Sequence, residues 1–207
     1  MLTKEYPKTL KLKDGRSVVL NPLARDAFDQ LHAFFLELPE EDRLFLRHDV
    51  KDPALIHRWT EDLDFDRVIP LVARDGDKIV GSGSLHLMAP GWMQHAGHVR
   101  MVTARSHRHQ GLGGLIARDL VALAMERNLE KLQVHIIEDN EGALRMCEAV
   151  GFQKVGVLPG MVKDQKGQSR NVVIMINDVI NLSQILEDWI QDSMIPSYRV
   201  PGAGVMD

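Results

Sequence analysis

Residues 99–114, VRMVTARSHRHQGLGG, place an apolar strand, a glycine-rich turn and the start of an amphipathic helix in direct succession. The first N–H groups of such a helix have no intrahelical partner, and the helix dipole adds about half a positive charge at that end. Gly111 and Gly113 lack the Cβ atoms that would keep an anion away from these groups. The sequence therefore predicts an anion-binding turn between a strand and a helix, within a mixed α/β fold.

The glycine spacing excludes two common anion-binding loops. A dinucleotide-binding loop needs G-x-G-x-x-G, and a nucleotide P-loop needs a lysine followed by serine or threonine after its last glycine. Neither pattern is present, because Arg108 is followed by Gly111, Gly113 and Gly114 and then by Leu115. Taken alone, these glycines are equally consistent with a plain turn before a helix, and a nucleotide-binding domain remains a less favoured alternative.

A second block, residues 140–152, has the sequence NEGALRMCEAVGF. The first block resembles the acetyl-CoA-binding motif R/Q-x-x-G-x-G/A of the GNAT superfamily of N-acetyltransferases. The second resembles that family's N-x-x-A-x-x-x-Y-x-x-x-G-F segment, with Asn140, Ala143, Gly151 and Phe152 in place. The blocks stand in the family's order, and the similarity extends over residues 76–176, with a fainter match over 16–47.

The resemblance implies a mixed, mostly antiparallel central sheet flanked by helices, with acetyl-CoA as co-substrate and an amine as acceptor. Backbone N–H groups of residues 108–114 would hold the pyrophosphate, and the main chain of residues 102–104 would pair with the pantetheine arm. The cofactor-binding residues expected on this basis are Val102, Thr103, Ala104, Arg108, His109, Gln110, Gly111, Leu112, Gly113, Gly114 and Asn140. Asn140 is equally credible as a helix N-cap, and the two roles are compatible.

Hydrophobic periodicity predicts the other elements. Helices are expected over residues 27–38, 40–47, 53–63, 112–124 and 140–151, and strands over 18–20, 68–73, 78–87, 95–103, 132–137, 152–158 and 171–176. Asp75, Gly76 and Asp77 predict a hairpin between two of these strands. An additional amphipathic helix over 182–190 packs on the sheet or contacts a second subunit, so a homodimer stays open.

The composition is that of an ordinary soluble globular protein. The 207 residues, 44% hydrophobic and 26% charged, predict one domain over residues 1–195 and a poorly ordered tail over 196–207. A net charge of -4 gives no electrostatic reason to expect nucleic acid or a membrane surface as partner. One cysteine, no signal peptide and no membrane span predict a cytoplasmic protein without a bound metal.

Acyl transfer to an amine needs a base that accepts the proton of the amine. The resemblance places a glutamate on the central strand, 14 residues before the first motif glycine, where this chain has Gly97. Candidates for the base are His95, His98 and His86, in that order, because histidine titrates near neutral pH. Strand alternation puts His95 on the same face as Gly97 and His98 on the opposite face.

Cys147 stands where the family places a tyrosine that protonates the leaving thiolate. A thiol is shorter by an aromatic ring, and its more ordinary role here is that of a small apolar residue on a helix. The missing glutamate and tyrosine keep two functions open. One is transfer of an acetyl group from acetyl-CoA to a primary amine of a small molecule or peptide, and the other is acyl-CoA binding by a non-catalytic sensor.

Overall fold

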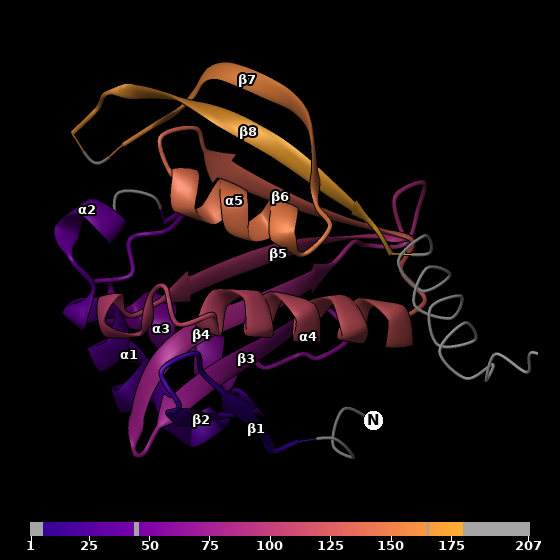
Figure 1. The fold of residues 1–207 in the computed structure, drawn as a ribbon. Coiled ribbons are helices and arrows are strands. Elements are labelled where there is room, and N and C mark those ends of the chain that lie inside the picture. Colours follow the sequence, from indigo (N-terminus) through magenta and orange to yellow (C-terminus); the bar gives the residue numbers. More distant parts are fainter. Residues whose placement is uncertain (1–5, 44–45, 165, 180–207) are drawn as a thin grey trace, which may run out of the picture.

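One eight-stranded sheet forms the centre of the molecule. The computed structural model describes residues 6–43, 46–164 and 166–179. Across the sheet the strands follow the order β1-β2-β3-β4-β5-β6-β8-β7 (Figure 1). They are β1 (Lys8–Lys11), β2 (Ser17–Pro22), β3 (Val68–Asp75), β4 (Lys78–Leu87), β5 (Ala96–Thr103), β6 (Lys131–Ile137), β7 (Gln153–Lys163) and β8 (Ser169–Asp178).

All neighbouring strands run antiparallel except β5 and β6, which run parallel. Parallel neighbours need a crossover connection. Here the crossover is α4 (Leu112–Glu126), which follows a short 3-10 turn, Arg105–His107. The sheet is therefore mixed and mostly antiparallel, as predicted, and the strand–turn–helix junction of residues 99–114 lies at its centre.

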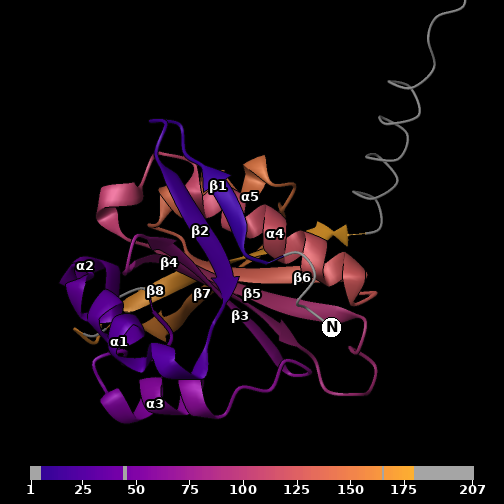
Figure 2. The ribbon, with the colours of Figure 1, turned by 90° about the horizontal axis from the view of Figure 1, so that it is seen from below.

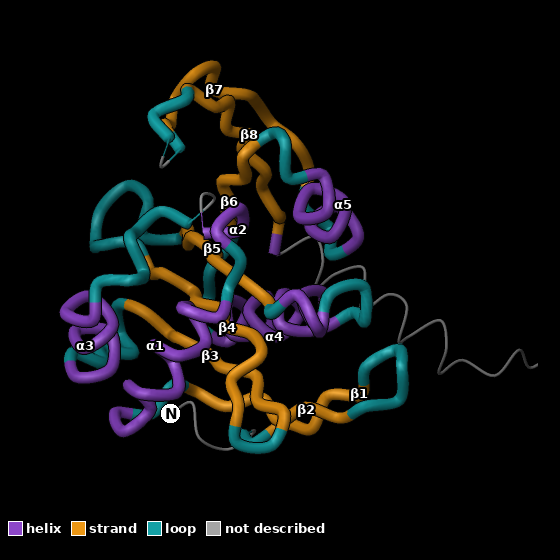
Figure 3. The backbone as a smooth tube through the Cα atoms, turned by 90° about the vertical axis from the view of Figure 1, so that its left-hand side faces the viewer, coloured by secondary structure: helices purple, strands orange, loops and turns teal. Residues whose placement is uncertain are grey.

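Helices cover both faces of this sheet. Figure 3 shows α1 (Phe28–Glu37) and α3 (Pro53–Glu61) on one face, and α4 and α5 (Glu141–Ala149) on the other. The short α2 (Glu40–Arg43) follows α1. Each face has its own apolar core, the larger under α4 and the smaller between α1, α3 and the sheet. Among the described helices, none is long and apolar enough to cross a membrane.

Two glycines of β4 allow α4 to approach the sheet closely. A Cβ atom at Gly81 would lie 2.9 Å from Ile116 Cδ1, and one at Gly83 would lie 2.6 Å from Ile116 Cγ2. Real Cβ atoms do not approach other atoms this closely, so a side chain at either position would force Ile116 to shift. The close contact fixes α4, and with it the turn at its N-terminus, relative to the sheet.

Most of the predicted elements are present, and the hairpin at Asp75 joins β3 to β4 as expected. The strand β1 was not predicted, because its short sequence KTLK is polar and it is held by pairing with β2. The predicted helix over 40–47 is shorter in the described chain, where α2 ends at Arg43. The predicted helix over 182–190 and the tail over 196–207 lie outside the described residues.

Candidate active site

The site begins where β5 and β6 separate. The two strands pair at three positions only, Ala96 with Lys131, Gly97 with Leu132 and His98 with Gln133. Beyond His98 they diverge (Figure 1), although β5 stays paired to β4 and β6 stays paired to β8. A wedge therefore opens inside the sheet, and it forms part of a cavity of about 1800 Å³.

The turn before α4 opens into this cavity. His109 and Gly111 both have positive φ angles, 61° and 85°, which turn successive N–H groups to the same side. Among the described residues, no backbone or side-chain acceptor receives a hydrogen bond from the N–H groups of residues 109–114. A Cβ at Gly114 would meet nothing within 4 Å. These six donors form a concave seat at the positive end of the α4 dipole, which suits an anion such as a diphosphate.

The hairpin of β1 and β2 contributes a lysine that sequence reasoning missed. In Figure 2 this hairpin lies nearest the viewer, at the β1 edge of the sheet. The backbone N–H of Lys13 donates to the Gln110 carbonyl at 3.0 Å, and a Cβ at Gly111 would lie 3.7 Å from Lys13 Cε. The exposed Lys13 side chain therefore lies directly against the turn. Only the tertiary contact reveals this position, because Lys13 is far from the motif in sequence.

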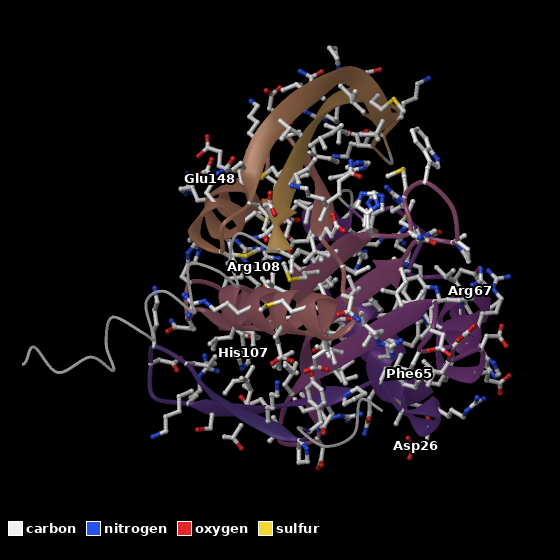
Figure 4. All side chains as sticks on the ribbon, turned by 90° about the vertical axis from the view of Figure 1, so that its right-hand side faces the viewer. Asp26, Phe65, Arg67, His107, Arg108 and Glu148 are labelled. Atoms are coloured by element: carbon white, nitrogen blue, oxygen red, sulfur yellow. The ribbon has the colours of Figure 1, made fainter. Side chains whose placement is uncertain are left out.

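The Arg108 side chain is paired within the protein, although its position in the motif suggests a contact with the cofactor. Its guanidinium binds the Asp42 carboxylate, with Nη2 2.6 Å from Oδ2 and Nη1 2.9 Å from Oδ1. Nη2 also donates to the Thr103 carbonyl at 3.4 Å. The side chain lies just before α4 (Figure 4). It thus connects α2 to the end of β5 and to the turn, and its charge is already balanced by a carboxylate.

The remaining predicted cofactor residues fall into two groups. Val102, Thr103, His109, Gln110 and Asn140 line the cavity. The side chain of Asn140 also caps α5, accepting a hydrogen bond from the Ala143 N–H at 3.2 Å.

The Ala104 amide and the Leu112 side chain are engaged within the protein. The N–H of Ala104 donates to the Val80 carbonyl on the β4 side at 2.8 Å, so this amide faces away from the wedge. The side chain of Leu112 is 1% exposed and belongs to the core under α4, whereas its N–H group is one of the donors of the turn.

The candidate histidines do not all lie at the cavity. His86 and His98 are cross-strand partners on the face opposite α4, and both line the cavity. His95 is exposed, precedes β5 and lies outside the cavity lining. Gly97 faces the α4 side, where a Cβ would lie 2.9 Å from Leu129 Cδ1. A side chain at the position where the family places its glutamate would therefore have to displace Leu129 and Leu85.

Burial and neighbouring positive charges favour the neutral form of four imidazoles at the cavity. Burial first, and then the charge of Arg100, lowers the pKa of His86 to about 4. Burial and nearby cations also lower the pKa values of His48, His98 and His135 from their ordinary value. Among the described residues, no group of three or more His, Cys, Asp or Glu side chains is arranged to hold a metal ion.

Cys147 lies on α5 with its thiol in the core. The residue is 2% exposed, and burial raises the pKa of its thiol to about 12. The charge of Glu148, on the outer side of α5 (Figure 4), raises this pKa further. Such a thiol holds its proton strongly, so it is a poor donor to a leaving thiolate.

The comparisons with known proteins agree with this geometry. The sequence model of the Acetyltransferase (GNAT) family matches residues 29–152. No curated protein sequence matches the chain significantly.

Three solved structures illustrate the shared fold. The GNAT domain of S. lividans PAT has a TM-score of 0.71 at 17% identity, covering 86% of this chain and 99% of that chain. The ribosomal-protein-S5-alanine acetyltransferase from Vibrio fischeri has a TM-score of 0.72 at 14% identity, covering 83% and 96%. The spermidine N-acetyltransferase from Vibrio cholerae, in complex with CoA and spermine, has a TM-score of 0.67 at 17% identity, covering 79% and 96%. Since the family match spans more than half of the chain and includes the turn before α4, this protein belongs to the GNAT acetyltransferase family.

Proposed function

We propose that this protein transfers the acetyl group of acetyl-CoA to a primary amine. The observation that carries the proposal is the run of N–H groups at the start of α4 that have no hydrogen-bond acceptor among the described residues and that open onto the wedge between β5 and β6. The GNAT family uses acetyl-CoA, and the Vibrio cholerae structure contains CoA. Acetyl-CoA supplies an acetyl group already activated as a thioester.

The residues at the turn suit the diphosphate of CoA. The N–H groups of residues 109–114 would donate to its oxygens, and Lys13 would add a positive charge beside Gly111. The free edges of β5 and β6 beyond His98 offer backbone hydrogen bonds to the amide groups of pantetheine. The cavity of about 1800 Å³ has room for the carrier and an acceptor together.

His98 is our candidate for the base. An alkylamine with a pKa of about 10.4 is almost fully protonated at pH 7, so a neighbouring group must accept its proton. The lowered pKa of His98 keeps its ring neutral and able to do so. His98 lies at the last paired position of β5, where the wedge opens. With the Cys147 thiol buried, water in the open cavity is left to protonate the thiolate.

The seat at α4 is tested with Gly113→Glu. A Cβ at Gly113 meets only ordinary contacts, the nearest being Met146 Cγ at 3.8 Å, so the variant is expected to fold. Its carboxylate would stand at the seat and repel the diphosphate. Calorimetry should show an affinity for acetyl-CoA at least ~100-fold lower, since like charges in contact cost several kcal/mol. Gly156→Glu, where a Cβ would meet nothing within 4 Å, is the matched control. Equal affinities in the two variants would refute the seat.

Non-catalytic acyl-CoA sensing is the second candidate, and the replacement of the family's glutamate by Gly97 favours it. The two functions separate in an assay of CoA release with a panel of amines. Tight acetyl-CoA binding without release of CoA above the hydrolysis rate, for every amine in the panel, would select the sensor.

A further inference from the structure

A set of basic side chains from four separate segments meets on the cavity face opposite α4. Arg47 and His48 come from the loop after α2, His86 from β4, His98 and Arg100 from β5, and His135 from β6. We call these six residues the basic wall. The rings of His98 and His135 are 5.3 Å apart between centroids, which links the β5 and β6 sides of the wall.

The two arginines of the basic wall have no carboxylate partner among the described residues. Arg100 Nη1 lies 3.4 Å from His48 Nε2, and Arg47 Nη2 lies 3.3 Å from His135 Nδ1. Other arginines of this chain do pair with carboxylates, as Arg108 does with Asp42 and Arg145 with Glu141. The described part of the chain thus supplies no counter-ion to these two guanidinium charges.

This excess of positive charge is local, because the chain as a whole is acidic. The full sequence has 29 Asp and Glu against 25 Lys and Arg. The cavity lining reverses the balance, with ten Lys and Arg side chains against the three carboxylates of Asp42, Asp62 and Asp64. Of these three, Asp42 is bound to Arg108 at the turn before α4. A positive field over the wall would attract an anion and repel a polycation.

The lowered pKa values in the basic wall indicate that its positive charges repel one another and that a bound anion would stabilise them. Burial and the charge of Arg47 lower the pKa of the Arg100 guanidinium, so the two charges destabilise each other. Both guanidinium groups also contribute to the lowered pKa of His135. A bound carboxylate or phosphate would relieve this repulsion, and it would be held by charge-assisted and potentially bidentate hydrogen bonds.

We infer that the acceptor amine of this enzyme carries an anionic group, a carboxylate or a phosphate, which Arg100 and Arg47 bind. The inference rests on the proposed acetyl transfer. Arg100 stands two residues from His98 on the same face of β5, which is about 6.6 Å along a strand. If the amine of the acceptor lies at His98 and its anionic group lies at Arg100, only a few bonds separate the two groups. The acceptor is therefore a small molecule.

Matched pairs of amines test this inference. L-alanine is compared with L-alaninamide, and O-phosphoethanolamine with ethanolamine, while spermidine represents a polycation. With acetyl-CoA saturating, kcat/KM for CoA release should be at least 10-fold higher for the anionic member of one pair or both. The pair with the larger ratio identifies carboxylate or phosphate as the preferred group. A preference for spermidine, or equal rates within both pairs, would overturn the inference and leave acetyl transfer standing.

The variant Arg100→Gln tests whether the preference for anionic amines depends on the basic wall. It should raise KM for the anionic amines at least 10-fold, with KM for acetyl-CoA unchanged. Arg25→Gln is the control, because it removes a charge outside the cavity. This variant should prefer anionic amines as strongly as the unmodified protein does. An Arg100→Gln enzyme that keeps the full preference would contradict the inference.

Binding is measured separately from turnover. Calorimetry on protein saturated with CoA, which has no acetyl group to transfer, should detect binding of the anionic member of a pair and not of the member without the anionic group, and Arg100→Gln should remove that signal. Equal binding of both members would overturn the inference. If no amine releases CoA, acetyl transfer fails, while the calorimetric comparison still decides whether the wall binds anions.

Discussion

At the scale of the residue, the two imidazoles that face each other across β4 and β5 differ in the chemistry they can perform. The His86 ring is hydrogen-bonded to Ser84, with Ser84 Oγ 3.0 Å from His86 Nε2. Its pKa of about 4 makes it a very weak base. His98 stands at the edge of the wedge, beside His135. Position therefore favours His98 over His86 as the group that accepts the amine proton.

Replacing His98 by Gln should lower kcat by at least ~100-fold, because a positioned general base contributes about 10²–10⁴. KM for acetyl-CoA should stay the same, since the turn before α4 is untouched. Steady-state kinetics of CoA release measure both values. His95→Gln is the control, because His95 is exposed and outside the cavity, and it should retain full activity. Comparable rates in the two variants would remove His98 from the mechanism.

His86 should also make stability depend on pH. Its pKa falls from 6.5 in the unfolded chain to about 4 in the fold, through burial and the charges of Arg100, His98, Arg47 and His48. Between these values the unfolded chain binds a proton that the folded chain does not, so stability falls as pH falls from 6.5 to about 4. After a discount for partial solvent exposure, the contribution is about 1–3 kcal/mol.

The variant His86→Gln measures this contribution. Urea unfolding at pH 7 and at pH 4.5 should show a smaller loss of stability for the variant than for the unmodified protein. Carboxylates titrate in the same range, but they are common to both proteins and cancel in the comparison. An identical loss in both would show that His86 is solvated in the fold.

At the scale of the element, the position of α4 decides whether the turn before it can hold an anion. The helix rests on β4 through Ile116, which occupies the space that side chains at positions 81 and 83 would need. The same packing aligns the N-terminus of α4 with the end of β5. The glycines of β4 therefore support the site although they do not touch it.

Gly83→Ala should destabilise the protein by about 1–3 kcal/mol, the usual cost of adding a methyl group to a packed core. The new Cβ would lie 2.6 Å from Ile116 Cγ2 and 3.1 Å from Leu120 Cδ1. The free energy of unfolding in urea measures the change. Gly156→Ala on β7, where the methyl group meets nothing within 4 Å, should change stability by less than about 0.5 kcal/mol. Equal stability of the two variants would mean that α4 shifts freely on the sheet.

At the scale of the whole molecule, the sequence predicted what is encoded locally. Residues 99–114 carry strand, turn and helix signals in one continuous run, so the sheet–helix junction and its glycine turn could be predicted. The basic wall could not, because Arg47, His98 and His135 come from segments far apart in the chain and meet only through the strand order. Lys13 was missed for the same reason, since a contact between the β1–β2 loop and the turn before α4 places it beside Gly111.

Acetyl-CoA binding should stabilise the fold as a unit, because the turn before α4, the wedge and the β1–β2 hairpin all belong to one sheet. A ligand at about 100 times its dissociation constant adds roughly 2.7 kcal/mol to the free energy of unfolding. For a domain of this size, that corresponds to a rise in melting temperature of about 5–10 °C.

Differential scanning fluorimetry with acetyl-CoA and with ATP tests this expectation. The turn lacks the lysine followed by serine or threonine that a nucleotide P-loop uses, so ATP at the same concentration should shift the melting temperature far less. CoA itself shares the 3′-phosphorylated ADP of acetyl-CoA, and it should stabilise the protein by a similar amount, since the turn binds the diphosphate. A larger shift with ATP than with CoA would mean that the seat at α4 recognises a triphosphate, and the assignment of acetyl-CoA to this cavity would then be withdrawn.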